Sequence, residues 1–301
     1  MIRTYTHKNI TWIDLEHPTT DEVRKIMQDY DISEVVAEEL LKPTFRSKVE
    51  IFDHYAYFIL QVPGVGPRSK AQEIDFILGK NFLITTRYEE IDPLLEFSKT
   101  LEVESILNKE SMGEHAGFLF FFMMRHLYQS LQEKIDSIDA HIRDIESQIF
   151  SGNERHMVTA LSKQARTLLN FKAATDSHEE VLESLEGVSG SIFGNGFEHY
   201  IKKISGECKK VRHLVLSKRD YVDELRDTND SLLNSKQNEI MKIFTVLAFV
   251  TFPISLVVEI LGIQSDTNPI LGNQNDFWII VGIVIGAVML MLAYFRKRDW
   301  L

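Results

Sequence analysis

The fold of this chain is decided by two stretches, IFTVLAFVTFPISLVVEILGI at residues 243–263 and FWIIVGIVIGAVMLMLAYF at residues 277–295. The first has 21 residues with one charge, Glu259, and the second has 19 residues with none. A helix rises about 1.5 Å per residue, so each stretch reaches about 30 Å, the thickness of the hydrocarbon core of a bilayer. The sequence therefore predicts two transmembrane helices near its C-terminal end.

The basic residues around these stretches predict their orientation. The connecting segment 264–276 contains no Lys or Arg, whereas Lys242 precedes the first stretch and Arg296, Lys297 and Arg298 follow the second. Because basic residues stay on the cytoplasmic side, both termini are expected in the cytoplasm and segment 264–276 outside. The chain is thus predicted to be a multi-pass protein of the inner or plasma membrane, ending in a basic cytoplasmic tail at 296–301.

The net charge of the chain comes entirely from the part before the membrane stretches. The 301 residues carry a formal net charge of −11, and four basic residues balance four acidic ones between 240 and 301. A strongly acidic cytoplasmic part disfavours nucleic acid as a partner and favours cations. With one cysteine, Cys208, the chain can form neither an intramolecular disulfide nor a cysteine-cluster zinc site.

The first 92 residues read as a small domain of mixed helices and strands. A strand is expected at 9–14, a helix beginning at Pro18, a second helix at 33–41 and strands within 48–62. Segments 73–78 and 81–86 are expected to pair as a hairpin around Gly79 and Lys80. The predicted fold class is therefore an α+β cytoplasmic domain, followed by helical segments and the two spans.

Residues 93–196 are expected to be helical and cytoplasmic. Isoleucines spaced alternately by three and four residues between Ile135 and Ile149 predict a coiled-coil-type seam in a helix at 118–150. A second helix is predicted at 155–185 and a loop at 189–196. From 197 a single stalk helix is predicted through 242 into the first span, about 60 residues in all, which is abnormal for one soluble domain.

One stripe of the first span and its approach is expected to line a pore. Its members recur every three or four residues and include the strongly polar residues of this stretch other than Glu239 and Lys242 at its cytoplasmic edge. They are Asn238, Met241, Thr245, Ala248, Phe252, Ser255 and Glu259. An apolar helix with a polar stripe is expected to turn that stripe toward water.

Glu259 is the sharpest candidate in this stripe. A carboxylate in hydrocarbon costs about 2.5–3.5 kcal/mol on insertion scales, so such residues usually face a cavity and have a function. In a symmetric oligomer Glu259 would form a ring of carboxylates that attracts cations. The alternative is that Glu259, four residues before the end of the span, reaches the outer interface and points at headgroups.

Several segments resemble the CorA-type divalent-cation channel family, and the resemblance covers nearly the whole chain. The segments are NITWIDLEHP (9–18), RSKVEIFDHY (46–55), ILGKNFLITT (77–86), KQNEIMKIFTVLAFVTFPISL (236–256) and YFRKRDWL (294–301). The resemblance implies a funnel-shaped homopentamer in the membrane, with a pore made by five first spans. It implies Mg²⁺, or Co²⁺, Ni²⁺ or Zn²⁺, as the permeant ion. Met241 and Phe244 match the apolar gate, and Asn238 matches a polar ring at the cytoplasmic mouth.

Two departures from the family pattern bear on ion choice and regulation. Gly262, Ile263 and Gln264 stand where the family has Gly-Met-Asn, so Gln264 and Glu259 are the expected metal-contacting residues of the outer pore. The family also senses cytoplasmic Mg²⁺ through two acids, of which Asp92 matches the first, while Lys203 falls at the second. Acidic residues further along the stalk could replace the missing second acid, and we name Asp227 as the candidate. The set comprises Asp220, Asp223, Glu224, Asp227 and Asp230. The alternative is that these residues form an acidic face exposed to solvent.

Two functions of different class therefore stay open. One is a passive divalent-cation channel driven by the membrane potential, with a zinc-type transporter of the same fold as a near variant. The other is a ligand-gated membrane effector with altered ion selectivity. No triad, metal-ligand or phosphate-loop pattern supports an enzyme, and no organic cofactor is expected.

Overall fold

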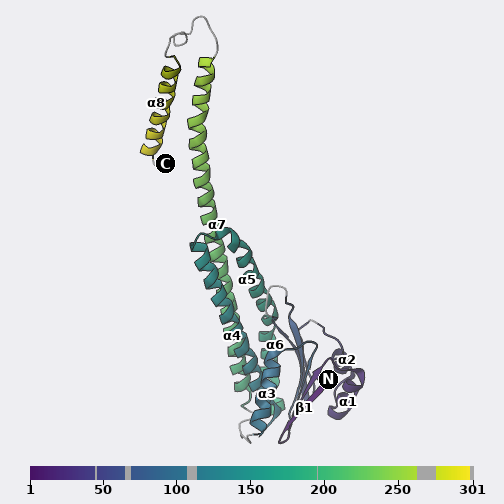
Figure 1. The fold of residues 1–301 in the computed structure, drawn as a ribbon. Helices are drawn as coiled ribbons and strands as arrows, with labels where there is room; N and C mark the ends of the chain where they lie inside the picture. The colour runs from purple at the N-terminus through teal and green to yellow at the C-terminus, as the bar shows by residue number, and fades with distance from the viewer. Residues whose placement is uncertain (45, 65–68, 107–113, 195, 263–275, 299–301) are drawn as a thin grey trace. The chain divides into compact units, whose positions relative to one another are not determined.

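The protein is described from a computed structural model covering residues 1–301 apart from 45, 65–68, 107–113, 195, 263–275 and 299–301 (Figure 1). Two compact units divide the chain, Met1–Asp227 and Thr228–Leu301. The first holds all the strands of the described residues, and the second holds the C-terminal helices. Each unit is treated by itself below.

A six-stranded sheet with the order β1-β2-β6-β5-β4-β3 forms the centre of the first unit. Only β2 and β6 pair in parallel, and the other neighbours are antiparallel. Every residue of β4 is buried, as expected for an inner strand covered on both faces. The strands are β1 (Ile2–His7), β2 (Ile10–Glu16), β3 (Val49–Ile51), β4 (Tyr55–Val62), β5 (Gln72–Gly79) and β6 (Phe82–Arg87).

The predicted hairpin is confirmed, and one strand was missed. Strands β5 and β6 pair in antiparallel register with Leu78 opposite Leu83, so the chain reverses at Gly79 and Lys80 as expected. Strand β1 was not predicted; it pairs with β2 through a tight turn in which Lys8 has a φ of 53°. Its exposure alternates between partial and full, so its sequence offers no run of buried residues to mark it.

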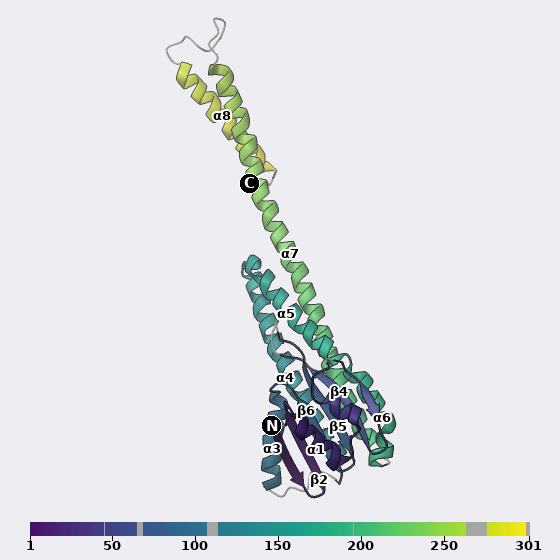
Figure 2. The same ribbon diagram turned by 90° about the vertical axis from the view of Figure 1, so that its right-hand side faces the viewer.

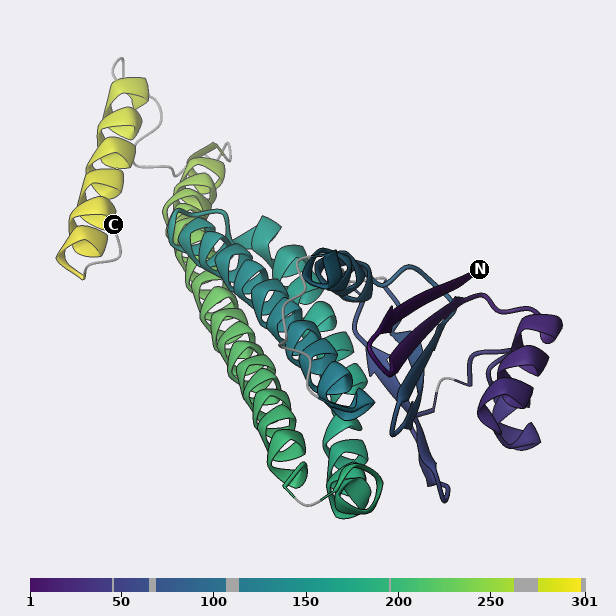
Figure 3. The ribbon, with the colours of Figure 1, turned by 90° about the horizontal axis from the view of Figure 1, so that it is seen from below.

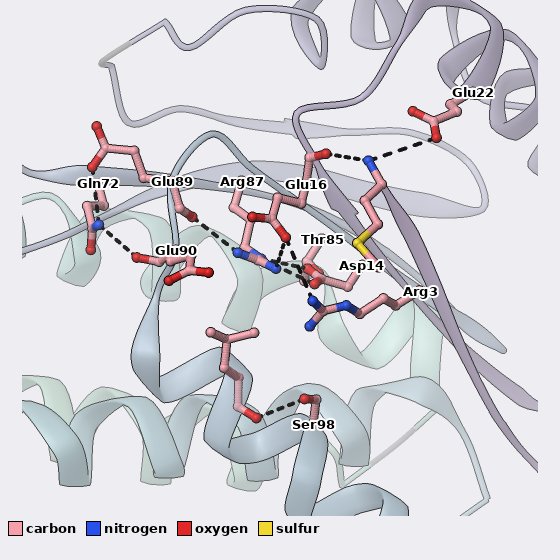
Figure 4. Close-up of polar contacts among 12 residues, drawn as sticks. Arg3, Asp14, Glu16, Glu22, Gln72, Thr85, Arg87, Glu89, Glu90 and Ser98 are labelled. Atoms are coloured by element: carbon pink, nitrogen blue, oxygen red, sulfur yellow. Dashed lines mark hydrogen bonds and ion pairs between the residues drawn. The ribbon is translucent and has the colours of Figure 1, made fainter.

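A buried arginine joins the parallel pair β2 and β6 (Figure 4). Arg87 is fully buried, with Nε 3.2 Å from Asp14 Oδ2 and Nη2 2.9 Å from Glu16 Oε2. Thr85 donates to Asp14 Oδ1 at 2.9 Å and accepts from Trp12 Nε1 at 3.0 Å. Removal of one partner would leave an uncompensated buried charge, which typically costs about 3–5 kcal/mol.

Helices α1 (Thr20–Tyr30) and α2 (Glu34–Glu39) cover one face of the sheet (Figure 3). The start of α1 is a capping box in which Thr19 Oγ1 accepts from Glu22 N and Glu22 Oε2 accepts from Thr19 N. Val23 and Ile26 of α1 pack with Val36 of α2 in one apolar cluster with the strands. This start agrees with the helix expected at Pro18.

The opposite face of the sheet is covered by longer helices (Figure 2). They are α3 (Asp92–Ile106), α4 (Ala116–Phe150), α5 (Glu154–Thr175) and α6 (His178–Phe193). Phe120 of α4 meets the rings of Phe58 and Phe76 on the sheet at 5.4 and 5.8 Å between centroids. The isoleucine seam is confirmed, since its five members between Ile135 and Ile149 are 0–7% exposed.

The helix predicted at 155–185 is in fact two helices, α5 and α6, separated at Asp176 and Ser177. The sequence has no Gly or Pro at this break. Tertiary contacts hold it instead: Ser177 Oγ lies 2.6 Å from Ser47 Oγ, and the side chain of His178 enters the core. Because residues that are distant in the sequence hold this turn, the local sequence contains no signal that predicts it.

The loop predicted at 189–196 is also corrected, because α6 continues through Phe193. The serines in this segment donate to carbonyls of their own helix, Ser189 to Glu186 O and Ser191 to Val188 O. The helix ends at Gly194, whose φ of 94° favours glycine. The turn thus begins at Gly194, after the serines that had suggested a loop.

The long uninterrupted helix expected from residue 197 is present as α7 (Glu198–Gly262), a single helix of 65 residues. Its first part belongs to the first unit and its remainder to the second, which also contains α8 (Asp276–Lys297). In the described residues two helices are long and apolar enough to cross a membrane, α7 in its C-terminal part and α8. The most apolar window of α8 has no buried residue.

Candidate functional site

The stripe proposed from the sequence lies entirely on α7, in the second unit. Six of its seven members are exposed in the single chain, and Thr245 is half-buried. Met241 is 58% exposed and Phe252 is 72% exposed, high values for large apolar side chains. One chain therefore leaves the stripe uncovered, and a pathway along it requires other copies.

The other sides of α7 are equally apolar and equally exposed. Ile243, Phe244, Leu247 and Phe249 are between 56% and 62% exposed, although Val246 is buried. So large an exposed apolar surface is uncommon in water and marks a membrane or protein contact. The stripe therefore differs from its surroundings chiefly by the polar groups at its two ends, Asn238 and Glu259.

The hydroxyl groups between these ends are already satisfied by the helix. Thr245 Oγ1 donates to Met241 O at 2.8 Å, and Ser255 Oγ donates to Thr251 O at 3.1 Å. Thr251, which lies outside the stripe, donates to Leu247 O at 2.9 Å in the same way. Hydroxyls bonded to the preceding turn tolerate an apolar environment. Thr245 and Ser255 therefore do not by themselves require water.

Pro253 lies inside α7 and was not singled out by sequence reasoning. Proline has no N–H, so the carbonyl of Phe249 loses its helical donor at this level. Inside a membrane such a carbonyl needs a neighbouring helix, a hydroxyl or water. A proline within an apolar run is the sequence signal that identifies this position.

Glu259 lies in the last turn of α7 and is exposed. Gly262 is the final residue of the helix, whereas Ile263 and Gln264 lie outside the described residues. Of the two residues predicted to contact the metal ion in the outer pore, Glu259 and Gln264, the structure therefore describes Glu259. Among described residues no group of three or more His, Cys, Asp or Glu side chains is placed to hold a metal ion.

The regulatory candidates Asp92, Lys203 and Asp227 all belong to the first unit. Asp92 begins α3 and is exposed, with no hydrogen-bond or ion-pair partner among the described residues. Lys203 is also exposed, and its Nζ lies 5.5 Å from the ring centre of Tyr200. Asp227 is the exposed residue at which the first unit ends. These positions stay candidates for an ion shared between copies.

A buried hydrogen-bonded group links α7 to the sheet and was missed from the sequence. His178 Nε2 lies 2.8 Å from Gln61 O, a carbonyl that can only accept, so Nε2 carries the proton. Nδ1 therefore accepts from Tyr128 Oη at 3.0 Å, and Cys208 of α7 contacts the same hydroxyl. Complete burial lowers the pKa of His178 to about 4. The imidazole is thus neutral and joins β4, α4 and α7.

A second buried polar group gathers carboxyl groups under α2. Burial and the neighbouring Glu73 raise the pKa of Asp75 well above its ordinary value. Tyr88 Oη lies 3.2 Å from Asp75 Oδ2. The pKa of Tyr88 is raised, mainly because the phenol is buried and in addition because Asp75 is close. Glu73 accepts from Gln61 Nε2 at 2.9 Å and from Thr44 N at 2.8 Å. The donors around these carboxyls indicate a structural role.

Comparisons with known proteins agree over nearly the whole chain. The family model described as "CorA-like Mg2+ transporter protein" matches residues 7–297. The "Cobalt/magnesium transport protein CorA" of Thermotoga maritima is 23% identical over 298 residues, which are 97% of this chain and 83% of that protein. The "Magnesium transport protein CorA" of Campylobacter jejuni (strain RM1221) is 22% identical, covering 98% of this chain and 92% of that protein.

Solved structures show the same fold. The complete structure of the CorA magnesium transporter from Methanocaldococcus jannaschii matches with a TM-score of 0.86 at 18% identity, covering 99% of this chain and 93% of that one. The full-length CmaX protein matches with a TM-score of 0.74 at 13% identity, covering 97% and 89%. The arrangement of a sheet-containing unit, a long helix and a second C-terminal helix is therefore shared with both.

Proposed function

The chain belongs to the family of CorA-like Mg²⁺ transporters, and from this premise we propose that it is a passive divalent-cation channel driven by the membrane potential. Mg²⁺ is the first candidate as permeant ion, with Co²⁺, Ni²⁺ and Zn²⁺ as alternatives. A divalent ion entering a negative compartment gains about 4.6 kcal/mol per 100 mV, so no energy-coupling site is needed. The names of the Thermotoga and Campylobacter relatives support magnesium or cobalt as cargo.

One observation carries the proposal. Helix α7 runs unbroken from a compact polar unit into a stretch that exposes apolar side chains and one carboxylate, Glu259. Since one such helix cannot enclose a path, we assign five copies to a closed ring, with the stripe from Asn238 to Glu259 turned inward. Met241 and Phe244 then form the apolar constriction, and five Glu259 carboxylates form a cation-attracting ring.

The basic residues in the last turn of α8 support the proposed orientation. Arg296 and Lys297 end α8, and Lys242 precedes the apolar part of α7. Both termini are then cytoplasmic, and the first unit with its acidic surface faces the cytoplasm. The protein is proposed to be a multi-pass protein of the cell membrane.

The second candidate is a ligand-gated channel of the same fold with altered selectivity. It is favoured by Gly262-Ile263-Gln264 in place of the family motif and by Lys203 at an expected acidic position. In this case the pore would pass monovalent ions or would need a cytoplasmic ligand in order to open. The same experiment separates the two candidates.

The test is ion entry into liposomes that contain the purified chain. Vesicles loaded with an ion-sensitive dye are given a K⁺ diffusion potential, and entry of Mg²⁺, Co²⁺, Ni²⁺, Zn²⁺ and Na⁺ is measured against protein-free vesicles. The proposal expects divalent entry that increases with a negative interior. Entry of Na⁺ alone favours the ligand-gated candidate, and the absence of any potential-dependent flux contradicts both.

A further inference from the structure

A basic groove lies between α5 and α7 in the first unit, although the protein as a whole is strongly acidic. Its volume is about 290 Å³, and three arginines line it together with Asp223, Ala165 and Leu169. We call Arg166, Arg219 and Arg226 the arginine groove. Leu169 within it is 51% exposed, so the groove combines a positive wall with an apolar contact.

The arginine groove has more positive charge than its own carboxylate neutralises. Arg226 lies 4.0 Å from Asp223, a long contact with both side chains largely exposed. Arg166 and Arg219 have neither a hydrogen bond nor an ion pair within the described part of the chain. A guanidinium offers five donors in a planar fork that fits a carboxylate, so the groove is suited to receive anionic oxygens.

An acidic surface lies on the neighbouring side of the same helix. Asp220 and Glu224 are exposed, and neither has a recorded hydrogen bond or ion pair among described residues. We call these two residues the acidic edge. The buried side of α7 at this level, formed by Val222 and Leu225, faces away from that edge. The acidic edge therefore points out of the protomer.

The two surfaces have the spacing that a five-membered ring requires. At 3.6 residues per turn, Arg226 lies about 20° around α7 from Arg219, whereas Asp220 and Glu224 lie about 100° and 140° away. In a closed ring of five, the directions from one member to its two neighbours diverge by about 108°. A heterologous ring needs complementary surfaces at such an angle.

The two surfaces also lie at the same level along the helix. Arg219 and Arg226 are about 10 Å apart along α7, and both members of the acidic edge lie between them in sequence. Rotation about a closed ring axis involves no translation, so surfaces that meet must share a level. The arginine groove and the acidic edge meet this condition.

We propose that the arginine groove is an inter-subunit docking site that receives Asp220 and Glu224 of a second copy of this chain. The inference rests on the proposed ring of five and deepens it, because it names the residues that hold neighbouring stalk helices together. The occupant is a second copy because the complementary anions are present on the chain itself, at the required angle and level.

Charge reversal tests this docking. Subunit exchange between two differently labelled populations in detergent is measured by energy transfer, for the wild type and for Arg219→Glu/Arg226→Glu. We expect the variant to exchange about tenfold faster or more, because like charges then oppose each other. Adding Asp220→Arg/Glu224→Arg to the same chain restores the opposite pairing and is expected to return exchange to near the wild-type rate.

A matched control changes the same charge elsewhere. Lys25→Glu/Lys99→Glu reverses two exposed lysines on α1 and α3 and is expected to exchange as the wild type does. An unchanged rate in the arginine variant, or no recovery in the charge-swapped chain, overturns the docking while leaving the ring intact. Binding of ATP or inorganic phosphate that depends on Arg219, with exchange unaffected, assigns the groove to a small anion instead. A wild-type chain that forms no ring overturns both the docking and the proposed function.

Discussion

Single side chains give the most direct access to the proposed pathway, and Glu259 is the first of them. It is exposed in the last turn of α7, among apolar neighbours such as Ile260 and Val258. A carboxylate at this position is stabilised either by water inside a pore that several copies enclose or by lipid headgroups at the membrane surface. The two environments predict different effects on ion flux when the charge of Glu259 is removed.

Replacing Glu259 by Gln is expected to reduce divalent-cation entry at least several-fold while the oligomer persists. The change removes the charge and keeps the shape, so it acts on cation attraction rather than on packing. Liposome flux with Mg²⁺ measures it. Glu180→Gln on α6, which removes an equal charge from an exposed position of the first unit, serves as the control and should keep full flux. Equal flux in Glu259→Gln and the wild type would place the carboxylate at the headgroups.

His178 provides a stability prediction that depends on pH. Its folded-state pKa is about 4, against an ordinary value near 6.5, so between these values the unfolded chain binds a proton that the folded chain does not. Stability is therefore lost as the pH falls from about 6.5 to 4, by up to about 3 kcal/mol. Thermal unfolding of the full chain in detergent, followed across this window, measures the loss.

The matched variants for that experiment are His178→Gln and His213→Gln. His178→Gln is expected to be less stable at neutral pH but to lose less stability on acidification, because the titrating group is gone. His213 is exposed on α7, so its replacement keeps the wild-type pH slope. The same slope in all three proteins would contradict a neutral buried imidazole.

The residues that could not be predicted are those whose partners are far away in sequence. Arg87 and Asp14 are separated by 73 positions, and His178 and Gln61 by 117. No local pattern encodes such pairs, because charge and hydrogen-bonding type do not specify a partner. Glu259 could be singled out because its surroundings in sequence are apolar, which is a local property.

At the scale of elements, α7 is the helix for which the sequence-based prediction and the structure agree best. The sequence from 197 to the first span contains no proline, and the helix spans Glu198–Gly262. The break between α5 and α6 was not visible, since Ser47 and the core around His178 hold it. Elements defined by their own composition are thus predictable, whereas boundaries set by tertiary contact are not.

If the proposed apolar constriction lies on α7, a polar substitution in it is expected to open the proposed pathway. Met241→Asn is expected to increase ion leak several-fold, because a polar ring holds water where an apolar ring excludes it. Basal dye influx in liposomes at low driving force is the measurement. Ile243→Asn, at a neighbouring exposed position outside the stripe, is the control and should not leak. Leak in both variants, or in neither, argues against Met241 as the constriction.

At the scale of the whole molecule, the exposed apolar surface of α7 and α8 requires partners. Mass measurement of the purified chain in detergent is expected to give five copies, since one α7 cannot enclose a path and a heterologous contact closes into a ring. Multi-angle scattering with the detergent contribution subtracted, or native mass spectrometry, would provide it. A stable monomer or dimer contradicts the channel.

The internally bonded hydroxyls of α7 have a consequence for how an ion would travel along the proposed pathway. Asn238 and Glu259 are about 30 Å apart along the helix, and in between Thr245, Thr251 and Ser255 direct their protons to their own backbone. An ion in that stretch meets oxygen lone pairs that can accept hydrogen bonds from its coordinated water, so it can keep that water, which suits Mg²⁺ because it dehydrates reluctantly. Its transit time is then set by diffusion of the aquo complex rather than by the rate of water exchange. Mg²⁺ and Co²⁺ would therefore cross this stretch at similar speed, and any discrimination between them would arise at its ends.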